Sequence, residues 1–205
     1  QVVTILGEDM DIAEQLGEPS ELVPIRSDGD DVSVRLDAPA RPGIFVATLR
    51  EALLAGAVNV VVHSFKDLPS APAPGLMIAA VPARGDARDV LFTRTGATLE
   101  ELPAGARVGT SSPRRTAALL RARPDLTVVP IRGNIDSRAA MVEDGRLDAV
   151  VLAKAGLDRI GRAVPAASIL SLDRMVPAPA QGALAIECRE DDPLARRLAA
   201  LEDPE

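Results

Sequence analysis

Apolar residues along most of this chain fall into two patterns, short continuous runs and stretches with helical spacing. The helical spacing predicts helices at 45–55, 113–123, 137–143 and 193–201. The short runs, rich in Val, Leu and Ile, predict strands at 58–62, 76–81, 90–94, 107–109, 127–131 and 148–153, and one more after Gly182. From residue 107 onward strands and helices alternate, which predicts a parallel sheet with right-handed crossovers.

The first 43 residues are less regular. Residues 1–16 place apolar side chains at roughly helical spacing despite Gly7, so we expect the chain to begin inside a helix. Residues 21–26 predict a strand. Because residues 27–43 contain turn-forming residues and two prolines, we expect an irregular loop there.

This order of elements predicts an α/β fold of two lobes. We expect one discontinuous domain at 1–82 and 174–205, and a second domain at 83–173. The chain would cross between them twice, near 82–90 and 171–177. Such a fold leaves a cleft between its lobes, and clefts of this kind commonly bind small ligands.

The amino-acid composition limits the kinds of ligand that the chain is expected to bind. The chain has 205 residues, 47% of them hydrophobic, with three Phe and no Trp or Tyr. Its core must therefore be built from Val, Leu, Ile and Ala, as is typical of a sheet covered by helices. The lack of aromatic residues and the net charge of −7 argue against binding nucleic acid. Local arginine clusters would have to bind any anion, so we expect a small acid as the ligand.

The sequence has only one cysteine and one histidine, which limits the disulfides and metal sites that it could form. Cys188 is the only cysteine and His63 the only histidine, which excludes an internal disulfide and leaves little support for a metal centre. The sequence has no apolar stretch of about 18 residues and no signal peptide pattern. We therefore expect a cytoplasmic protein with no membrane partner and no bound metal.

The stretch Gly109-Thr110-Ser111-Ser112-Pro113-Arg114-Arg115 has an unusual charge placement for a helix start. Ser112 is a favourable N-cap and Pro113 a favourable first helical residue. Arg114 and Arg115 then lie in the first turn, where the helix dipole already presents positive charge. This pattern is typical of an anion-binding corner. An ordinary solvated arginine pair is an equally open interpretation.

A second polar stretch, His63-Ser64-Phe65-Lys66-Asp67-Leu68-Pro69, follows a predicted buried strand. The carboxyl ends of parallel strands are where open α/β sheets bind ligands, although a simple polar turn before Pro69 would show the same pattern. Arginines match carboxylates in a bidentate manner, so Arg114, Arg115, Arg132 and Arg138 together predict a ligand with several carboxylates. An aspartate among them, Asp67, is suited to stabilising a cationic intermediate.

Four stretches of this sequence, in order and with matching spacing, closely resemble the porphobilinogen deaminase (hydroxymethylbilane synthase) family. They are His63 to Pro69, Val108 to Arg115, Leu126 to Arg138 with its Arg132-Gly133-Asn134, and Pro177 to Ala183 with Glu187-Cys188-Arg189. The resemblance implies that the first two domains have a fold similar to type II periplasmic binding proteins. It also implies a transferase that joins four porphobilinogen molecules head to tail, releases ammonia and uses a dipyrromethane cofactor.

The resemblance further implies roles for individual residues. Asp67 would be the catalytic carboxylate that interacts with pyrrole nitrogens and stabilises the charge that develops as ammonia leaves. A larger group would bind the acetate and propionate side chains of the substrate and the growing chain. This group is Ser64, Lys66, Ser112, Arg114, Arg115, Arg132, Gly133, Arg138, Arg159 and Gln181.

The sequence departs from the family pattern in three places. The family opens with a strand bearing an Arg-x-Gly-Thr-Arg-x-Ser motif, which this chain lacks. Arg41-Pro42-Gly43 stands where many members have Gly-Lys-Gly. The family attaches its cofactor to a cysteine in a third domain that this chain does not contain, and Cys188 is expected to be a small core side chain instead. We therefore expect the chain to be two domains of a longer enzyme, a monomer, without covalent cofactor and with little turnover on its own.

A non-catalytic two-lobe module that binds a polycarboxylate is the alternative function. The arginines and the expected cleft suit that interpretation equally well. Asp67 favours the enzyme, because a receptor for carboxylates has little use for an anion at its centre.

Overall fold

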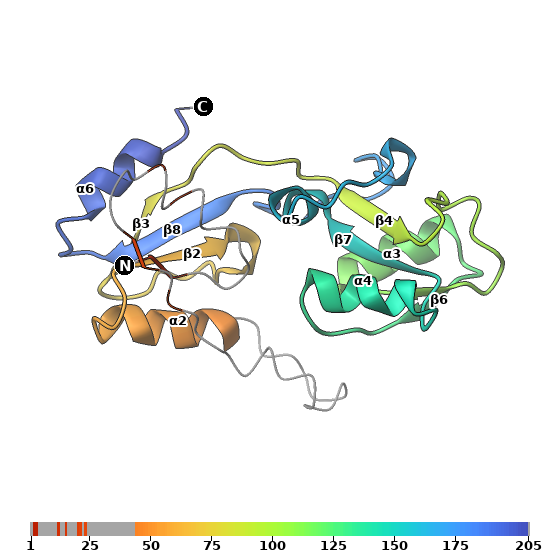
Figure 1. The fold of residues 1–205 in the computed structure, drawn as a ribbon, viewed down its shortest axis with the longest axis horizontal. Helices are drawn as coiled ribbons and strands as arrows, with labels where there is room; N and C mark the ends of the chain where they lie inside the picture. Colours follow the sequence, from red (N-terminus) through yellow and green to blue (C-terminus); the bar gives the residue numbers. More distant parts are fainter. Residues whose placement is uncertain are drawn as a thin grey trace. The chain divides into compact units, whose positions relative to one another are not determined.

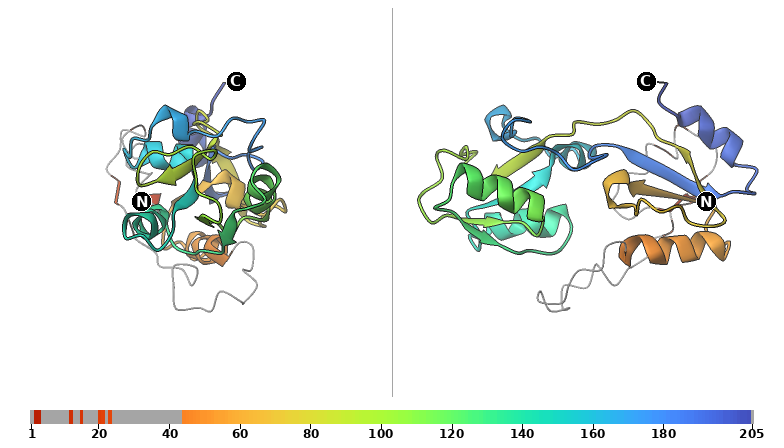
Figure 2. Two further views of the ribbon diagram at one scale, coloured as in Figure 1. Left: turned by 90° about the vertical axis from the view of Figure 1, so that its right-hand side faces the viewer. Right: turned by 180° about the vertical axis from the view of Figure 1, so that it is seen from behind.

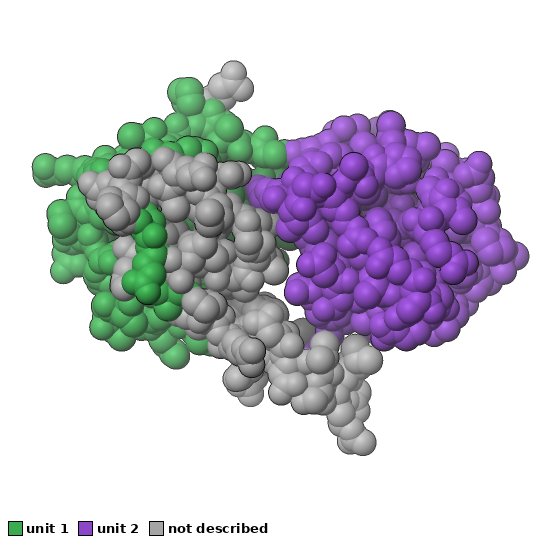
Figure 3. Space-filling view, viewed as in Figure 1, with its two compact units in different colours: residues 1–31, 40–85, 182–205 green, residues 32–39, 86–181 purple. Residues whose placement is uncertain are grey.

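The computed structural model describes residues 44–204, together with Val2, Val3, Ile12, Gln15, Ser20, Glu21 and Val23. The chain divides into two compact units, residues 1–31, 40–85 and 182–205 in unit 1 and residues 32–39 and 86–181 in unit 2 (Figure 3). The chain thus passes between units after Gly85, within the predicted crossing at 82–90. It passes back after Gln181, later than the predicted crossing at 171–177.

The described strands of unit 1 form one mixed sheet in the order β1-β2-β8-β3. The strands are β1 (Val2–Val3), β2 (Val60–Ser64), β3 (Leu76–Ala80) and β8 (Leu184–Arg189). β1 runs parallel to β2, whereas β8 is antiparallel to both β2 and β3. β8 is thus the strand by which the chain returns to this sheet after residue 181.

Helices cover both faces of this sheet. Helix α2 (Ile44–Leu54) packs Leu49 and Leu53 against Val61, and helix α6 (Ala195–Leu198) packs Leu198 on the other face with Val60 and Val62. Figures 1 and 2 show the sheet between α2 and α6. Successive residues of β2 thus point to opposite apolar layers, which explains its unbroken Val run.

The described strands of unit 2 form a second mixed sheet, in the order β4-β7-β5-β6. They are β4 (Asp89–Thr93), β5 (Arg107–Gly109), β6 (Thr127–Val129) and β7 (Ala149–Ala153). β5 runs parallel to β6 and β7, as the alternating pattern predicts, whereas β4 is antiparallel to β7.

The helices of unit 2 also lie on both faces of their sheet. Helix α3 (Pro113–Ala122) packs Leu119 with Val108 and Val151, whereas α4 (Ile135–Glu143) and α5 (Lys154–Arg159) pack on the layer that contains Val150. α4 is nearer the viewer in Figure 1 and α3 is nearer in the reverse view of Figure 2. Gly109 ends β5, where an added Cβ would come within 2.7 Å of Leu147 and 3.0 Å of Val150.

Several element boundaries differ from the sequence prediction. Val2 and Val3 form a strand, so the expectation that the chain begins inside a helix is wrong at this end, because their backbone pairs with Val60 and Val61. Helix α4 begins two residues earlier than predicted, because Asn134 caps it by accepting a hydrogen bond from the Ser137 N–H at 2.9 Å. The predicted helix at 193–201 is shorter, with α6 followed by the 3-10 turn η4 (Ala199–Leu201).

The predicted loop at 27–43, with its Arg41-Pro42-Gly43, lies outside the described residues, as do most positions of the predicted elements at 1–16 and 21–26. Within the described part, no helix is long and apolar enough to cross a bilayer. That part also contains no group of three or more His, Cys, Asp or Glu side chains placed to bind a metal ion.

Candidate functional site

The predicted anion-binding corner forms the start of helix α3 in unit 2. Ser112 is the N-cap, and its Oγ accepts a hydrogen bond from the Arg115 N–H at 3.4 Å, while Pro113 is the first helical residue. The preceding strand is fixed by a hydrogen bond from the Thr110 N–H to the Val129 carbonyl at 2.9 Å. The local helix-start signals therefore place Arg114 and Arg115 as the sequence predicts.

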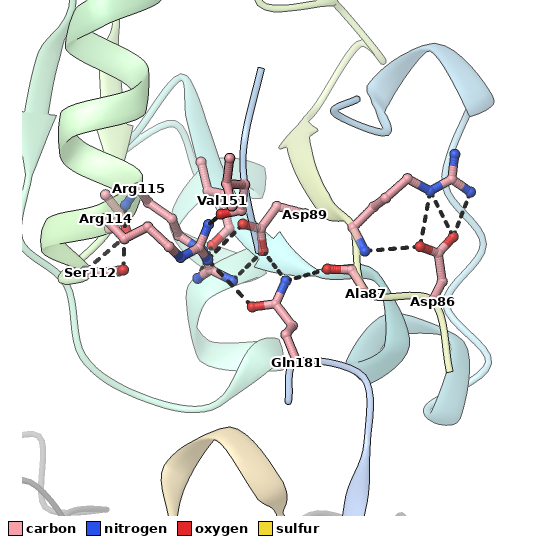
Figure 4. Close-up of polar contacts among 11 residues, drawn as sticks. Asp86, Ala87, Asp89, Ser112, Arg114, Arg115, Val151 and Gln181 are labelled. Carbon is pink, nitrogen blue, oxygen red and sulfur yellow. Dashed lines mark hydrogen bonds and ion pairs between the residues drawn. The ribbon is translucent and has the colours of Figure 1, made fainter. Parts of the chain in front are cut away.

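The partner of these two arginines is a buried aspartate that lies one residue before the strand predicted at 90–94. Asp89 is the first residue of β4 and is fully buried. Its carboxylate accepts hydrogen bonds from Arg115 Nη2 at 2.6 Å and from Arg114 Nη2 at 2.8 Å (Figure 4). A buried carboxylate requires such compensation, and two guanidinium groups supply it.

Gln181 completes this group of side chains. Its Nε2 donates to Asp89 Oδ1 at 2.9 Å and to the Ala87 carbonyl at 2.7 Å, and its Oε1 accepts from Arg114 Nη2 at 3.4 Å. We call Asp89, Arg114, Arg115 and Gln181 the Asp89 cluster. Gln181 is only 1% exposed, so the structure places this predicted ligand-binding residue inside unit 2.

The electrostatics of the cluster keep Asp89 ionised. Burial on its own raises the pKa of the Asp89 carboxyl. The charge of Arg115 and the hydrogen bonds from Arg115 and Arg114 outweigh that effect, so the pKa lies below its ordinary value. One carboxylate and two guanidinium groups leave the cluster with a net positive charge, which still suits an anionic ligand.

Arg115 retains one donor for which the structure shows no acceptor. Its Nη1 donates to the Val151 carbonyl at 3.0 Å and its Nη2 to Asp89. Its Nε is buried and has no hydrogen-bond partner among the described residues. Because buried donors are almost always paired, such an atom is a candidate contact for a ligand oxygen.

Unit 1 carries the second predicted motif at the end of β2. Ser64 is the last residue of β2, and Lys66 and Asp67 lie on the following 3-10 turn η2 (Phe65–Asp67). The turn is held by hydrogen bonds from the Phe65 N–H to the Ala183 carbonyl and from the Leu68 N–H to the Phe65 carbonyl, both at 3.1 Å. Asp67 is exposed to solvent.

A second buried carboxylate contacts the first residue of this motif, His63. Glu187 of β8 accepts hydrogen bonds from Arg50 Nη2 at 2.8 Å and Arg50 Nε at 3.0 Å, and its Oε2 lies 2.9 Å from His63 Nε2. We call Glu187, Arg50 and His63 the Glu187 cluster. Burial raises the pKa of the Glu187 carboxyl, but the hydrogen bonds with His63 and Arg50 lower it below its ordinary value overall.

The remaining predicted site residues lie on other elements of unit 2. Arg132 and Gly133 form the turn before α4, where Gly133 adopts a left-handed φ of +101°, and Arg138 lies in α4 while Arg159 ends α5. Arg132 lines a hollow of about 620 Å³ together with Arg107, Ile131, Ser137, Met141 and Arg146. The Asp89 cluster thus includes Arg114, Arg115 and Gln181 of the predicted set, whereas Arg132, Arg138 and Arg159 lie on other elements of the unit.

Cys188 lies in the core, which confirms its interpretation as a core side chain. It is fully buried in the middle of β8 and packs with the apolar layer beneath α6. Burial raises the pKa of its thiol to about 11, so the reactive thiolate is scarce at neutral pH.

Two solved binding proteins have a fold similar to that of this chain. The chain aligns over 99% of its length with a periplasmic substrate-binding protein of an ABC transporter from Coxiella burnetii, at a TM-score of 0.60, 16% identity and 92% coverage of that protein. It aligns over 98% of its length with the methionine-binding protein MetQ, at a TM-score of 0.61, 15% identity and 88% coverage. The chain therefore has the two-lobe α/β fold of type II periplasmic binding proteins, as predicted.

Sequence relatives identify the family. Residues 6–197 match the family model described as "Porphobilinogen deaminase, dipyromethane cofactor binding domain", and the chain belongs to this family. It is 53% identical to porphobilinogen deaminase of Nocardia farcinica over 188 residues, which cover 91% of the chain and 54% of the relative. It is 53% identical to that of Thermobifida fusca over 176 residues, which cover 86% of the chain and 55% of the relative. The chain spans little more than half the length of these curated relatives.

Proposed function

We propose that this chain contributes the first two domains of a porphobilinogen deaminase, a transferase of tetrapyrrole (heme) biosynthesis. The enzyme would join four porphobilinogen molecules into hydroxymethylbilane and release one ammonia for each porphobilinogen. The observation that carries the proposal is the match of residues 6–197 to the porphobilinogen deaminase family. The exposed Asp67 of unit 1 and the helix start with Arg114 and Arg115 in unit 2 supply residue types that suit this chemistry. We further propose a cytoplasmic monomer that acts on small molecules and not on nucleic acid, in keeping with its net charge of −7.

The chemistry assigned to Asp67 follows from the charge that the reaction creates. When the amino group of porphobilinogen leaves as ammonia, the bond between nitrogen and the methylene carbon breaks, and the pyrrole with its methylene carbon becomes a cation. The free α-carbon of a second pyrrole then forms the new C–C bond to this methylene carbon and loses its proton. The Asp67 carboxylate would accept a hydrogen bond from the pyrrole N–H and stabilise this cation as it forms.

The basic residues would bind the carboxylates of substrate and cofactor. Arg114 and Arg115 combine permanent charge with the N–H groups of a helix start, a combination that favours carboxylates. We assign the same role to Ser64, Lys66, Ser112, Arg132, Gly133, Arg138 and Arg159.

The residues present fit the dipyrromethane cofactor named in the family description. The buried Nε of Arg115 lacks an acceptor among the described residues, and a carboxylate of the cofactor would supply one. When bound, the dipyrromethane supplies a pair of pyrroles to which the growing chain is joined. Cys188 is not its attachment site, because this thiol is fully buried in the core.

The test uses the whole protein expressed from its complete coding sequence. We expect the wild-type protein to consume porphobilinogen with release of ammonia, and we expect Asp67→Asn to lose at least about 100-fold in kcat because the cation is no longer stabilised. Asp191→Asn, which changes an exposed acid in the loop after β8, is the control and should keep normal turnover.

Two outcomes would contradict the proposal. Near-normal turnover of Asp67→Asn would remove Asp67 from its catalytic role. Binding of porphobilinogen by the wild-type protein without ammonia release would instead support a non-catalytic polycarboxylate-binding module.

A further inference from the structure

We propose that Asp89 and Gln181 are positioning residues, which hold Arg114 and Arg115 in place for the ligand and join them to the two segments of unit 2 that adjoin the passages after Gly85 and after Gln181. This inference rests on the proposed function for the identity of the ligand. The arrangement of the side chains does not depend on that identity.

The first step concerns where the partners come from. Residues 86–89 directly follow the passage between units after Gly85, and residues 176–181 directly precede the passage after Gln181. Gln181 joins these segments, because its Nε2 donates both to the Ala87 carbonyl at 2.7 Å and to Asp89 Oδ1 at 2.9 Å. Arg114 joins them again through the Val176 carbonyl and Asp89 Oδ2 (Figure 4).

The second step concerns burial. Asp89 and Gln181 are 0% and 1% exposed, so neither has surface to offer to a ligand. The Arg114 side chain keeps 26% of its surface exposed. The buried pair therefore acts on a ligand through the arginines and not by touching it.

The third step concerns the backbone next to Gln181. Ala180 adopts a left-handed φ of +57°, the only positive φ of a non-glycine residue in the described part of the chain. An L-residue in this region is strained and persists only where its surroundings hold it. The hydrogen bonds of the Gln181 side chain, and that from its N–H to the Ala178 carbonyl at 3.1 Å, provide this support.

The fourth step concerns charge. Arg114 and Arg115 are neighbours in sequence and both direct Nη2 at the same carboxylate. Without the charge of Asp89 the two guanidinium groups would repel one another and separate. Asp89 therefore sets the spacing of two donors that would otherwise be mobile.

The experiment uses Asp89→Asn and Gln181→Met in the whole protein, with Asp86→Asn as the matched control. Asp86 lies three residues before Asp89 and pairs with Arg88 at 2.5 Å, but this pair is largely exposed and stands apart from the cluster. We expect the KM for porphobilinogen to rise at least tenfold in Asp89→Asn and about threefold in Gln181→Met, with kcat reduced less than threefold. Asp86→Asn should match the wild type.

A second measurement reports the arginines directly. In ¹⁵N-resolved NMR spectra the Nε–H signals of Arg114 and Arg115, assigned with Arg→Lys variants, should be sharp and dispersed in the wild type. In Asp89→Asn they should move into the envelope of exposed arginines, and Asp89→Glu should partly restore them. If Asp89→Asn fails to fold, Gln181→Met, which leaves the charge of Asp89 in place, decides the question by the same two measurements.

The outcomes separate this inference from the proposed function. An unchanged KM together with unchanged arginine signals in a folded variant would overturn the positioning role. A fall in kcat with an unchanged KM would also overturn it, because Asp89 would then act in the chemistry. If the wild-type protein bound porphobilinogen without turnover, the proposed function would fail, and the dissociation constant would replace KM in the same comparison.

Discussion

Among the residues that the structure describes, each unit buries a carboxylate against two cationic or hydrogen-bonding groups, but the two clusters differ in the nature of those groups. Asp89 of unit 2 meets two arginines, which are permanently charged. Glu187 of unit 1 meets one arginine, Arg50, and a histidine, His63, which is charged only when protonated. Similar burial thus leads to a cluster with excess positive charge in one unit and to a nearly balanced one in the other.

This difference suits the two units to different tasks. A cluster with excess positive charge can hold an internal carboxylate and still attract that of a ligand. A balanced cluster contributes mainly to the shape of its surroundings. The Glu187 cluster is linked to the turn that carries Asp67 through His63, which is two residues before the first residue of that turn. We therefore expect perturbations of the Asp89 cluster to affect both ligand binding and stability, and those of the Glu187 cluster to affect stability most.

The largest effect on stability is expected from removing a permanent charge beside Asp89. Arg115→Met leaves a buried carboxylate whose charge is only partly compensated by Arg114. The free energy of unfolding should therefore fall by about 3–5 kcal/mol. Urea unfolding followed by circular dichroism measures this loss. Arg121→Met, at an arginine near the end of the same helix, is the control and should unfold like the wild type. A loss as small as that of the control would mean that Asp89 does not depend on Arg115.

A smaller effect is expected from acid. The pKa of Asp89 is lowered on folding, from an unfolded value of about 3.9. Its contribution to stability is therefore fully present above pH 4 and is lost as pH falls through the folded pKa. The stability difference between wild type and Asp89→Asn should be constant near neutral pH and should shrink below pH 4, because the protonated aspartic acid resembles asparagine. Urea unfolding at pH 7, 5, 4 and 3 measures it. A difference that grows in acid would contradict the lowered pKa.

The two clusters also show which features of the structure could be predicted from the sequence and which could not. The helix start at Ser112 and the apolar runs of the strands were predictable, because each depends on residues close together in the chain. The family resemblance added Asp67 and the arginines. Asp89 was missed, because its partners lie 25, 26 and 92 residues away and only the folded sheet brings them together.

The N-terminal strand was missed for a related reason. Val2 and Val3 suit a helix or a strand equally well by local pattern, and only their pairing with β2 decides between them.

One signal for Asp89 was available in the sequence. An acidic residue that directly precedes a buried apolar strand needs a cationic partner. Arg114 and Arg115 lie at a helix start, where the helix dipole disfavours positive charge, so they need an acidic partner.

The smallest effect is expected in the Glu187 cluster, at the group whose charge is not permanent. His63→Leu removes one of the contacts of Glu187 but leaves its hydrogen bonds with Arg50, so the protein should lose only about 1–2 kcal/mol of stability. His63→Gln can still donate a hydrogen bond to the carboxylate and should lose less than His63→Leu. Thermal unfolding at neutral pH compares the two variants. If His63→Leu were as damaging as Arg115→Met, the two clusters would be equivalent, and the excess of permanent charge around Asp89 would no longer distinguish unit 2 from unit 1.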